Sequence, residues 1–312
     1  MAFFDLEEIN YRTIVDPKGF VEECDAEYAA KVSLAADRII ENLEHSPVVL
    51  LSGPSGSGKT TSAQKIEEEL ERRGIGSHTV SMDNYFKTVD PETSPRSEDG
   101  SLDFESPLCL DLPLFNKQLD QLERGERIAI PKYNFAVHAR DIDPSKILKL
   151  KKDEIVIFEG IHALNDIITE SHPNAFKLYI SARSDTYFGD RLIFKGTWLR
   201  LMRRTVRDHL FRSYDPDKTI AMWGNVRRGE KLYISPFKNK ANLKFDTALK
   251  YEAPVMNNIA TKLFANIPEG VERYEELRKL LPALQLFGVI KSDLVAPDSL
   301  IREFIGGGIY SQ

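Results

Sequence analysis

The segment from Gly53 to Thr60 reads G-P-S-G-S-G-K-T and fits the pattern G-x-x-x-x-G-K-[ST]. Glycines without side chains let successive backbone N–H groups close around phosphate oxygens, Lys59 supplies positive charge, and the Thr60 hydroxyl can ligate Mg²⁺. The segment follows the apolar run 48–51 and precedes a helix-like stretch from about Thr60 to Arg73, whose positive end would point at the phosphates. This context favours a phosphate site over the alternative of a glycine-rich turn that binds nothing. The expected phosphate contacts are Gly53, Ser55, Gly56, Ser57, Gly58, Lys59, Thr60 and Thr61.

Two acidic residues follow expected strands and could take part in phosphoryl transfer. Asp83 comes after the short strand-like run that begins at Thr79, so it would lie at the carboxyl edge of a sheet, where ligands bind. A carboxylate there can accept the proton of an attacking hydroxyl, although an Asp in this position often only caps a turn. Glu159 ends an apolar run and is the expected Mg²⁺ ligand together with Thr60. A solvent-facing Glu159 is the alternative, but an acid that follows four apolar residues usually needs a partner.

The segment 131–140 reads P-K-Y-N-F-A-V-H-A-R and concentrates groups that can recognise a planar ring. Aromatic and imidazole rings can stack on such a ring, and a guanidinium group can hydrogen-bond its edge. A histidine in such a run can also be purely structural. The six histidines of the chain show no zinc-like spacing, so we expect no zinc site.

An arginine-rich helix is expected near residues 198–212. Its arginines share one side of the helix and are Arg200, Arg203, Arg204 and Arg207. With Asp208 as the only acid nearby in the sequence, these charges would repel one another unless an anion such as a triphosphate neutralised them. A solvated charged face is the alternative. The pattern therefore allows a set of arginines that stabilises charge during phosphoryl transfer.

Short strand-like runs alternate with helices between residues 46 and 253, which indicates a parallel sheet covered by helices on both faces. The expected strands are 48–52, 78–81, 154–158 and 176–180, and the expected helices are 60–73, 111–124 and 198–212. Residues 1–45 form a leader with one amphipathic helix, residues 86–101 form a surface loop, and residues 254–312 form a helical extension. Together with the motif at 53–60, this alternation leads us to expect an α/β fold of the P-loop NTPase/kinase type.

Composition is that of a globular protein. The 312 residues carry a formal net charge of −6, which argues against a protein that coats nucleic acid. Two cysteines, Cys24 and Cys109, suggest neither a disulfide framework nor a cysteine metal site, and they favour a reducing compartment. No apolar run approaches a membrane span or a signal sequence. We therefore expect a cytoplasmic protein with no membrane or nucleic-acid partner.

Taken in order, the motifs resemble the uridine kinase branch of the phosphoribulokinase/uridine kinase family of P-loop kinases. The resemblance covers about residues 46–253. It rests on the segments 53–60, 81–86 (S-M-D-N-Y-F), 103–107 (D-F-E-S-P), 131–140, 158–161 (F-E-G-I) and 200–208 (R-L-M-R-R-T-V-R-D). The stretch 222–230 and the tail 301–307 resemble the longer bacterial uridine-kinase-like proteins.

The resemblance implies an ATP- or GTP-dependent, Mg²⁺-requiring kinase of pyrimidine nucleosides that acts in pyrimidine salvage. Asp83 would be the base toward the ribose 5′-hydroxyl, and Glu105 would hold the ribose hydroxyls, with Asp103 as the fallback. The remaining implied contacts are Tyr133 and His138 to the pyrimidine, Arg140 in support of that loop, Arg204 and Arg207 in a lid over the phosphates, and Thr60 with Glu159 on Mg²⁺. The family also suggests a homo-oligomer, which the residues themselves leave open.

The chain departs from the family pattern at three places. Asn134 stands where the family usually has Asp, the sequence after the arginine-rich helix reads Arg212-Ser213-Tyr214 without the usual arginine that follows, and the stretch 185–197 is longer and could alter lid closure. Two other functions remain open. One is a kinase of another small hydroxyl compound, such as a sugar phosphate or a pantothenate-like acceptor. The other is a nucleotide-gated regulatory protein whose helical tail docks a partner.

Overall fold

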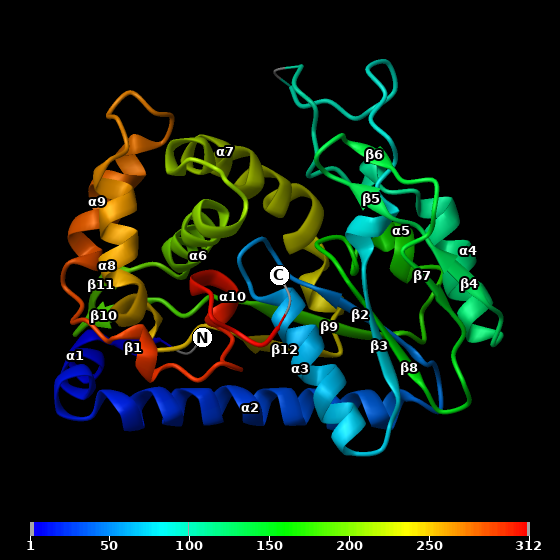
Figure 1. Ribbon diagram of the computed structural model, residues 1–312, viewed down its shortest axis with the longest axis horizontal. Helices are drawn as coiled ribbons and strands as arrows, with labels where there is room; N and C mark the ends of the chain where they lie inside the picture. Colours follow the sequence, from blue (N-terminus) through cyan, green and yellow to red (C-terminus); the bar gives the residue numbers. More distant parts are fainter. Residues whose placement is uncertain (1–2, 99, 311–312) are drawn as a thin grey trace.

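A five-stranded parallel sheet forms the centre of the computed structural model, which describes residues 3–98 and 100–310 (Figure 1). The strand order is β12-β9-β2-β8-β3, and every neighbouring pair is parallel. The strands are β2 (Val48–Ser52), β3 (Ser77–Ser81), β8 (Ile155–Glu159), β9 (Phe176–Ser181) and β12 (Leu243–Asp246). The expected α/β fold with a parallel sheet is therefore confirmed, and β12 is an edge strand that the sequence analysis did not identify.

Both faces of the sheet are buried, and the alternation of side chains along β2 explains why its sequence is continuously apolar. Val49 and Leu51 belong to one hydrophobic core, whereas Val48 and Leu50 belong to a second one. Successive side chains of a strand point to opposite faces, so a strand between two layers of helices needs apolar residues at every position.

Helices cover both faces of the sheet. The core that contains Leu51 also includes residues of α2 (Pro17–Asn42), α3 (Lys59–Arg72), α6 (Gly196–Phe211) and α8 (Glu252–Ala265). The core that contains Leu50 includes residues of α4 (Leu112–Glu123) and α5 (Asp166–Thr169). The sheet thus lies between two layers of helices, and the glycine-rich loop that joins β2 to α3 begins at its carboxyl edge.

The N-terminal leader contains two helices, α1 (Leu6–Val15) and α2, instead of the single helix that we expected. Asp16 and Pro17 separate them. The Asp16 side chain accepts a hydrogen bond from the Gly19 N–H and caps α2, while Pro17 occupies the first turn, where it needs no N–H donor. The long helix α2 lies against α3, β9 and β12, so the leader packs on the sheet (Figure 1).

The long stretch 185–197 contributes two strands to a small second sheet. Within it, β10 (Thr186–Phe188) and β11 (Arg191–Phe194) form an antiparallel hairpin, and β10 pairs in parallel with β1 (Phe4–Asp5). The extra length therefore builds a small three-stranded sheet with the start of the chain. Sequence alone could not show this, because the two pairing segments are far apart in the chain.

The C-terminal region contains α8, α9 (Tyr274–Leu284) and α10 (Arg302–Ile305), together with the short 3-10 turn η5 (Ser292–Leu294). The expected boundary at 253/254 falls inside α8. A single hydrophobic core also runs from Leu6 to Phe304, across both expected boundaries. The terminal segments therefore pack on the sheet and its helices as parts of one body.

The remaining elements connect these strands and helices. They are the short turns η1 (Met82–Tyr85) and η2 (Pro107–Cys109), the hairpins β4 (Ile128–Ile130)/β7 (Lys146–Leu148) and β5 (Tyr133–Asn134)/β6 (Ala139–Arg140), α7 (Pro216–Gly229), and the turns η3 (Glu230–Ile234) and η4 (Ser235–Lys240). The described part of residues 86–101 forms a loop, as expected. Within residues 3–98 and 100–310, no helix combines the length and the apolar character needed to cross a bilayer.

Candidate active site

The glycine-rich loop joins β2 to α3 and has backbone geometry that requires its glycines. Gly56 and Gly58 have φ values of 74° and 79°, in the left-handed region that disfavours residues with a Cβ. At Gly53 a Cβ would lie 2.2 Å from the carbonyl oxygen of Ile180. The loop therefore depends on glycine both for its turn and for its close approach to the end of β9.

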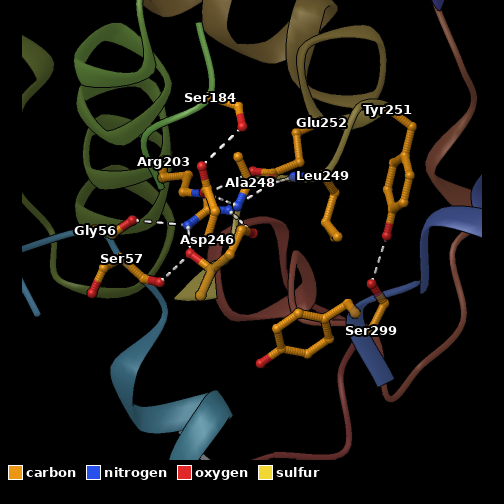
Figure 2. Close-up of polar contacts among 12 residues, drawn as sticks. Gly56, Ser57, Ser184, Arg203, Asp246, Ala248, Leu249, Tyr251, Glu252 and Ser299 are labelled. Atoms are coloured by element: carbon orange, nitrogen blue, oxygen red, sulfur yellow. Dashed lines mark hydrogen bonds and ion pairs between the residues drawn. The ribbon is translucent and has the colours of Figure 1, made fainter. Parts of the chain in front are cut away.

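Neighbouring side chains hold the loop through its carbonyl oxygens. The Arg200 guanidinium donates to the Ser55 carbonyl at 3.2 Å, and Arg203 donates to the Gly56 carbonyl at 3.0 Å. The Thr247 hydroxyl donates to the Ser57 carbonyl at 2.7 Å. Figure 2 shows the contact between Arg203 and Gly56. Residues from α6 and from the end of β12 thus fix the loop without using its glycine N–H groups.

Two of the four helix arginines do not face a ligand. Arg200 and Arg203 are buried and pair with the carboxylates of Glu230 and Glu252, with closest distances of 2.7 and 2.5 Å. The expectation that all four arginines converge on an anion is wrong for this pair. The sequence did not reveal these partners because the two glutamates belong to later elements of the chain, η3 and α8. Most of α6 is buried as well, so this helix is part of the core and is not a loosely attached lid.

Arg204 contacts the glycine-rich loop, and Arg207 contacts Glu303 beside the N-terminus of α3. Arg204 Nη1 donates to Ser55 Oγ at 2.8 Å, and its Nε lies 3.3 Å from Asp208. Arg207 Nη1 lies 3.4 Å from a carboxylate oxygen of Glu303, which belongs to α10. Both guanidinium groups therefore lie near the P-loop and the start of α3, and their contact with phosphates stays a prediction.

Lys59 is surrounded by three carboxylates. Glu159, Asp83 and Glu303 all lie within electrostatic reach of its ammonium group. Burial lowers the pKa of Lys59, and these carboxylates oppose the change. The geometry follows from the sheet, because β3 and β8 pair in register with Ser81 opposite Glu159, and Asp83 comes two residues after Ser81.

Asp83 and Glu159 differ in exposure, although they share Lys59 as a neighbour. Asp83 is exposed in η1, and its N–H is capped by the Ser81 hydroxyl at 3.3 Å. Partial enclosure raises the pKa of Asp83, while Lys59 opposes the rise. Glu159 is buried at the end of β8, and burial raises its pKa to about 7. An exposed acid beside a buried one can divide the roles of base and metal ligand.

The residues around Glu159 fit a magnesium ion. A buried carboxylate with a second carboxylate, Asp83, nearby gains stability from a divalent cation. Thr60 is exposed in the first turn of α3 and offers a hydroxyl oxygen. Mg²⁺ prefers oxygen ligands and is commonly held by one or two carboxylates together with phosphate oxygens.

Glu105 belongs to the same group of charged residues. Its side chain packs on Gly229 at the end of α7, and it interacts electrostatically with Arg204, Lys59 and Asp83. Burial raises the pKa of Glu105 to about 7. Asp103, the fallback for its role, is instead engaged by the protein itself, with Arg228 at 2.9 Å and the Tyr233 hydroxyl at 3.3 Å.

The expected ring-binding segment forms the β5/β6 hairpin, but its two ring-bearing candidates, Tyr133 and His138, differ in exposure. Tyr133 is buried against Phe86 and Phe135, and its hydroxyl has no hydrogen-bond partner among the residues that the structure describes. The exposed His138 ring stacks on Phe104 with ring centres 5.2 Å apart. The tip of the hairpin thus supplies one ring of a stacked pair, and the segment before η2 supplies the other ring through Phe104.

Arg140, at the end of β6, connects the hairpin to neighbouring segments. It lies 2.9 Å from an Asp111 oxygen and donates to the carbonyls of Tyr85 and Phe86, both at 3.1 Å. These contacts tie the hairpin to η1, which carries Asp83. Arg140 therefore holds the hairpin against η1, and its support of a substrate-binding loop stays a prediction.

Three residues near the site were missed by the sequence analysis. Phe104 lies within the D-F-E-S-P motif, where only its acidic neighbours were assigned. Arg212 was noted only as a departure from the family pattern, yet its charge acts on Asp83. Glu303 lies in the tail motif and contacts Arg207 and Thr61. For Glu303 the sequence carried no spacing signal, because only the fold brings α10 to α3.

The fold and this group of residues define a P-loop phosphotransferase. A model described as the phosphoribulokinase/uridine kinase family matches residues 48–251, about two thirds of the chain. The chain belongs to the phosphoribulokinase/uridine kinase family. Residues 48–251 accordingly form a kinase unit, of the class that transfers a phosphoryl group to an alcohol acceptor.

Individual relatives agree with this assignment. A uridine kinase of Saccharomyces cerevisiae is 29% identical over 238 residues, which cover 75% of this chain and 43% of the yeast protein. A uridine kinase of Deinococcus deserti is 27% identical over 197 residues, which cover 63% of this chain and 85% of that protein. The chain therefore spans less than half of the yeast relative and most of the bacterial one.

A solved structure supports the fold. The crystal structure of a candidate fructose transport system kinase from a Silicibacter species has a TM-score of 0.51 with 18% sequence identity. The match covers 69% of this chain and 98% of the other. At this level of identity the likeness concerns the fold alone.

Proposed function

We propose that this protein is an ATP-dependent nucleoside kinase that transfers the γ-phosphoryl group to the 5′-hydroxyl of uridine or cytidine. GTP is the alternative donor. Such an activity serves pyrimidine salvage in the cytoplasm. The single observation that carries the proposal is the arrangement of an exposed acid, Asp83, and a buried acid, Glu159, around the P-loop lysine Lys59.

In this proposal Asp83 is the general base. It accepts the proton of the 5′-hydroxyl as that oxygen forms its bond to the γ-phosphorus and the bond from the γ-phosphorus to the β–γ bridging oxygen breaks. The nucleoside diphosphate leaves with the negative charge on its β-phosphate. Lys59, Arg204 and Arg207 stabilise the charge on the phosphates, so catalysis depends mainly on positioning and electrostatics.

Thr60 and Glu159 would hold Mg²⁺. When bound, the ion neutralises charge on the β- and γ-phosphate oxygens. Glu159 would then be ionised despite its burial, because the cation offsets the desolvation that raises its pKa. The loop residues Gly53 to Gly58 and Thr61 would supply the remaining phosphate contacts.

The acceptor would lie between Asp83 and the β5/β6 hairpin. Glu105 would accept hydrogen bonds from the ribose hydroxyls, and its proximity to Arg204 would place the ribose near the transferred phosphate. The pyrimidine would meet the exposed His138–Phe104 stack. The Tyr133 hydroxyl, which is buried without a partner among the described residues, would be available for a polar edge of the base after a small shift of the hairpin. Arg140 would hold the hairpin in place.

The test is phosphoryl transfer from Mg·ATP to a panel of uridine, cytidine, adenosine, ribulose 5-phosphate and pantothenate. We expect uridine or cytidine monophosphate as the product. In Asp83→Asn we expect kcat to fall by about two to four orders of magnitude, while ATP still binds, because only the base is removed. Asp90→Asn is the matched control, since Asp90 is an exposed acid of the adjacent loop, and its activity should not change.

Other outcomes of the same panel discriminate between functions. Transfer to ribulose 5-phosphate or pantothenate alone would refute the pyrimidine acceptor but keep the kinase. ATP binding without transfer to any acceptor would refute the nucleoside kinase and favour a regulatory protein. Full activity in Asp83→Asn would overturn the base assignment.

A further inference from the structure

The C-terminal segment lies directly against the phosphate-binding end of α3. In Figure 1, α10 lies beside α3 and α6. Leu300, Ile301 and Phe304 are fully buried, and a Cβ on Gly58 would come within 2.7 Å of a Leu300 methyl group. The tail therefore packs on the glycine-rich loop itself.

Glu303 makes the contacts of a bound anion. One of its carboxylate oxygens accepts from the Thr61 hydroxyl at 2.7 Å and from the Thr61 N–H at 3.4 Å. The other oxygen lies 3.4 Å from Arg207 Nη1. Thr61 is the third residue of α3, so its N–H is one of the free donors at the start of the helix. In a P-loop these donors serve nucleotide phosphates.

Neighbouring contacts fix Glu303 in this position. The Phe304 ring lies under the guanidinium groups of Arg203 and Arg207, 4.9 and 5.9 Å from its centre. The Ser299 hydroxyl is 2.7 Å from the Tyr251 hydroxyl (Figure 2). Both hydroxyls also contact the Asp25 carboxylate on α2. The carboxylate is thus held on a packed segment and does not belong to a loose side chain.

We propose that Glu303 is a built-in competitor for the nucleotide: its carboxylate occupies the place of a phosphate group at Thr61 and Arg207 and must leave when the triphosphate binds. This inference rests on the proposed nucleotide site. Lys59 already has Glu303 within electrostatic reach, so the carboxylate also offsets the positive charge of Lys59. A triphosphate brings like charge to the same place, and the two anions exclude each other.

The competitor lowers the apparent affinity for nucleotide. A protein binds more weakly when its binding-competent state is only partly populated, and removal of the competing charge restores that state. The contact further couples the tail to the site, because nucleotide binding must release Glu303 from Thr61. Anything that holds the tail in place would oppose binding, and anything that lifts it would promote binding.

The test compares the parent chain with Glu303→Gln by titration calorimetry, with inorganic tripolyphosphate and Mg·ATP as separate ligands. The amide keeps the size of the side chain but removes its charge. We expect Glu303→Gln to bind both ligands at least fivefold more tightly, with a difference that shrinks as ionic strength rises. Glu303→Asp, which keeps the charge but shortens its reach, should give a smaller gain.

Asp298→Asn is the matched control. Asp298 lies on the same tail, its side chain is largely exposed, and it pairs with Lys65 of α3 at 3.2 Å, so this variant removes the same charge without contact to Thr61. We expect its affinity to equal that of the parent. An equal gain in Asp298→Asn would reduce the effect to net charge and overturn the proposal.

Unchanged or weaker ligand binding in Glu303→Gln would also overturn the proposal. The absence of ligand binding in both the parent and Glu303→Gln would overturn it as well. If thermal unfolding shows that Glu303→Gln does not fold, the affinity of Glu303→Asp for the two ligands is the deciding measurement. An affinity equal to that of the parent would then count against the proposal. Tripolyphosphate needs no acceptor. Tighter tripolyphosphate binding in Glu303→Gln would therefore support Glu303 as a competitor even if no nucleoside monophosphate is formed. In that case only the proposed nucleoside acceptor would be refuted.

Discussion

Arg203 and Glu252 form an ion pair in which neither side chain is exposed to solvent, with Arg203 Nε 2.6 Å from a Glu252 oxygen. Arg203 also donates to the carbonyls of Gly56 and Thr247, and Glu252 accepts from the N–H of Leu249 (Figure 2). One arginine on α6 thus joins the glycine-rich loop, the end of β12 and the start of α8. The shape of the glycine-rich loop therefore depends on a buried ion pair, Arg203–Glu252, that lies outside the loop.

Loss of this pair should destabilise the whole fold. Arg203→Met leaves the Glu252 carboxylate buried without its partner, and we expect the free energy of unfolding to fall by about 3–5 kcal/mol. Urea unfolding followed by circular dichroism measures the change. Arg38→Met is the control, because Arg38 and Glu41 form an exposed pair that should contribute less than about 1 kcal/mol. Equal effects of the two substitutions would contradict this account, and Arg203→Met with Glu252→Leu should recover part of the loss.

The glycine-rich loop should tolerate no side chain at Gly56. An added Cβ would lie 2.8 Å from the carbonyl oxygen of Arg200, and the φ of 74° is strained for any L-residue. We expect Gly56→Ala to weaken Mg·ATP binding by about tenfold or more, which corresponds to about 1.4 kcal/mol. Gly125→Ala is the control, since Gly125 has a φ of 70° but nothing within 4 Å of a Cβ. That variant should bind as the parent does, and weaker binding in both would point to general strain instead.

Nucleoside use should depend on pH through Glu105. Burial raises the pKa of Glu105 to about 7, so the carboxylate is mostly protonated below that pH and mostly ionised above it. If the ionised form accepts the ribose hydroxyls, kcat/KM for uridine should rise between about pH 6 and pH 8. Glu105→Gln should lower kcat/KM and flatten the rise. The profile is measured at saturating Mg²⁺, which would keep Glu159 ionised in its proposed role as a metal ligand. An unchanged slope in Glu105→Gln would assign the titration to another group.

The hairpin tip should contribute to recognition of the base. His138 has a φ of 51°, so Asn is the replacement that removes the ring and still suits the left-handed backbone. We expect His138→Asn to raise the KM for uridine by roughly two- to tenfold, as the loss of about 0.5–1.5 kcal/mol of stacking predicts. The KM for ATP should stay the same. Val137→Ala at the neighbouring exposed position should change neither value, and a rise in the KM for ATP would place His138 outside the acceptor site.

Local sequence predicted the elements whose signals are contained within one segment. The apolar run of β2, the glycine positions of the loop and the amphipathic α2 each follow from spacing that a short window reveals. Elements that depend on distant partners were missed. β12 is only partly apolar and forms a strand because it pairs with β9, and β1 exists because β10 lies beside it.

The sequence by itself determined the fold class, the P-loop and the acids at the strand ends, since each depends on residue types at fixed local spacing. Only the tertiary structure decided how the charges are shared. It directs Arg200 and Arg203 to the buried carboxylates of Glu230 and Glu252, and it brings Glu303 to Thr61 from 242 residues away. Charge neutralisation acts through space, over a few ångströms, so it is set by which segments pack together and not by their order in the chain.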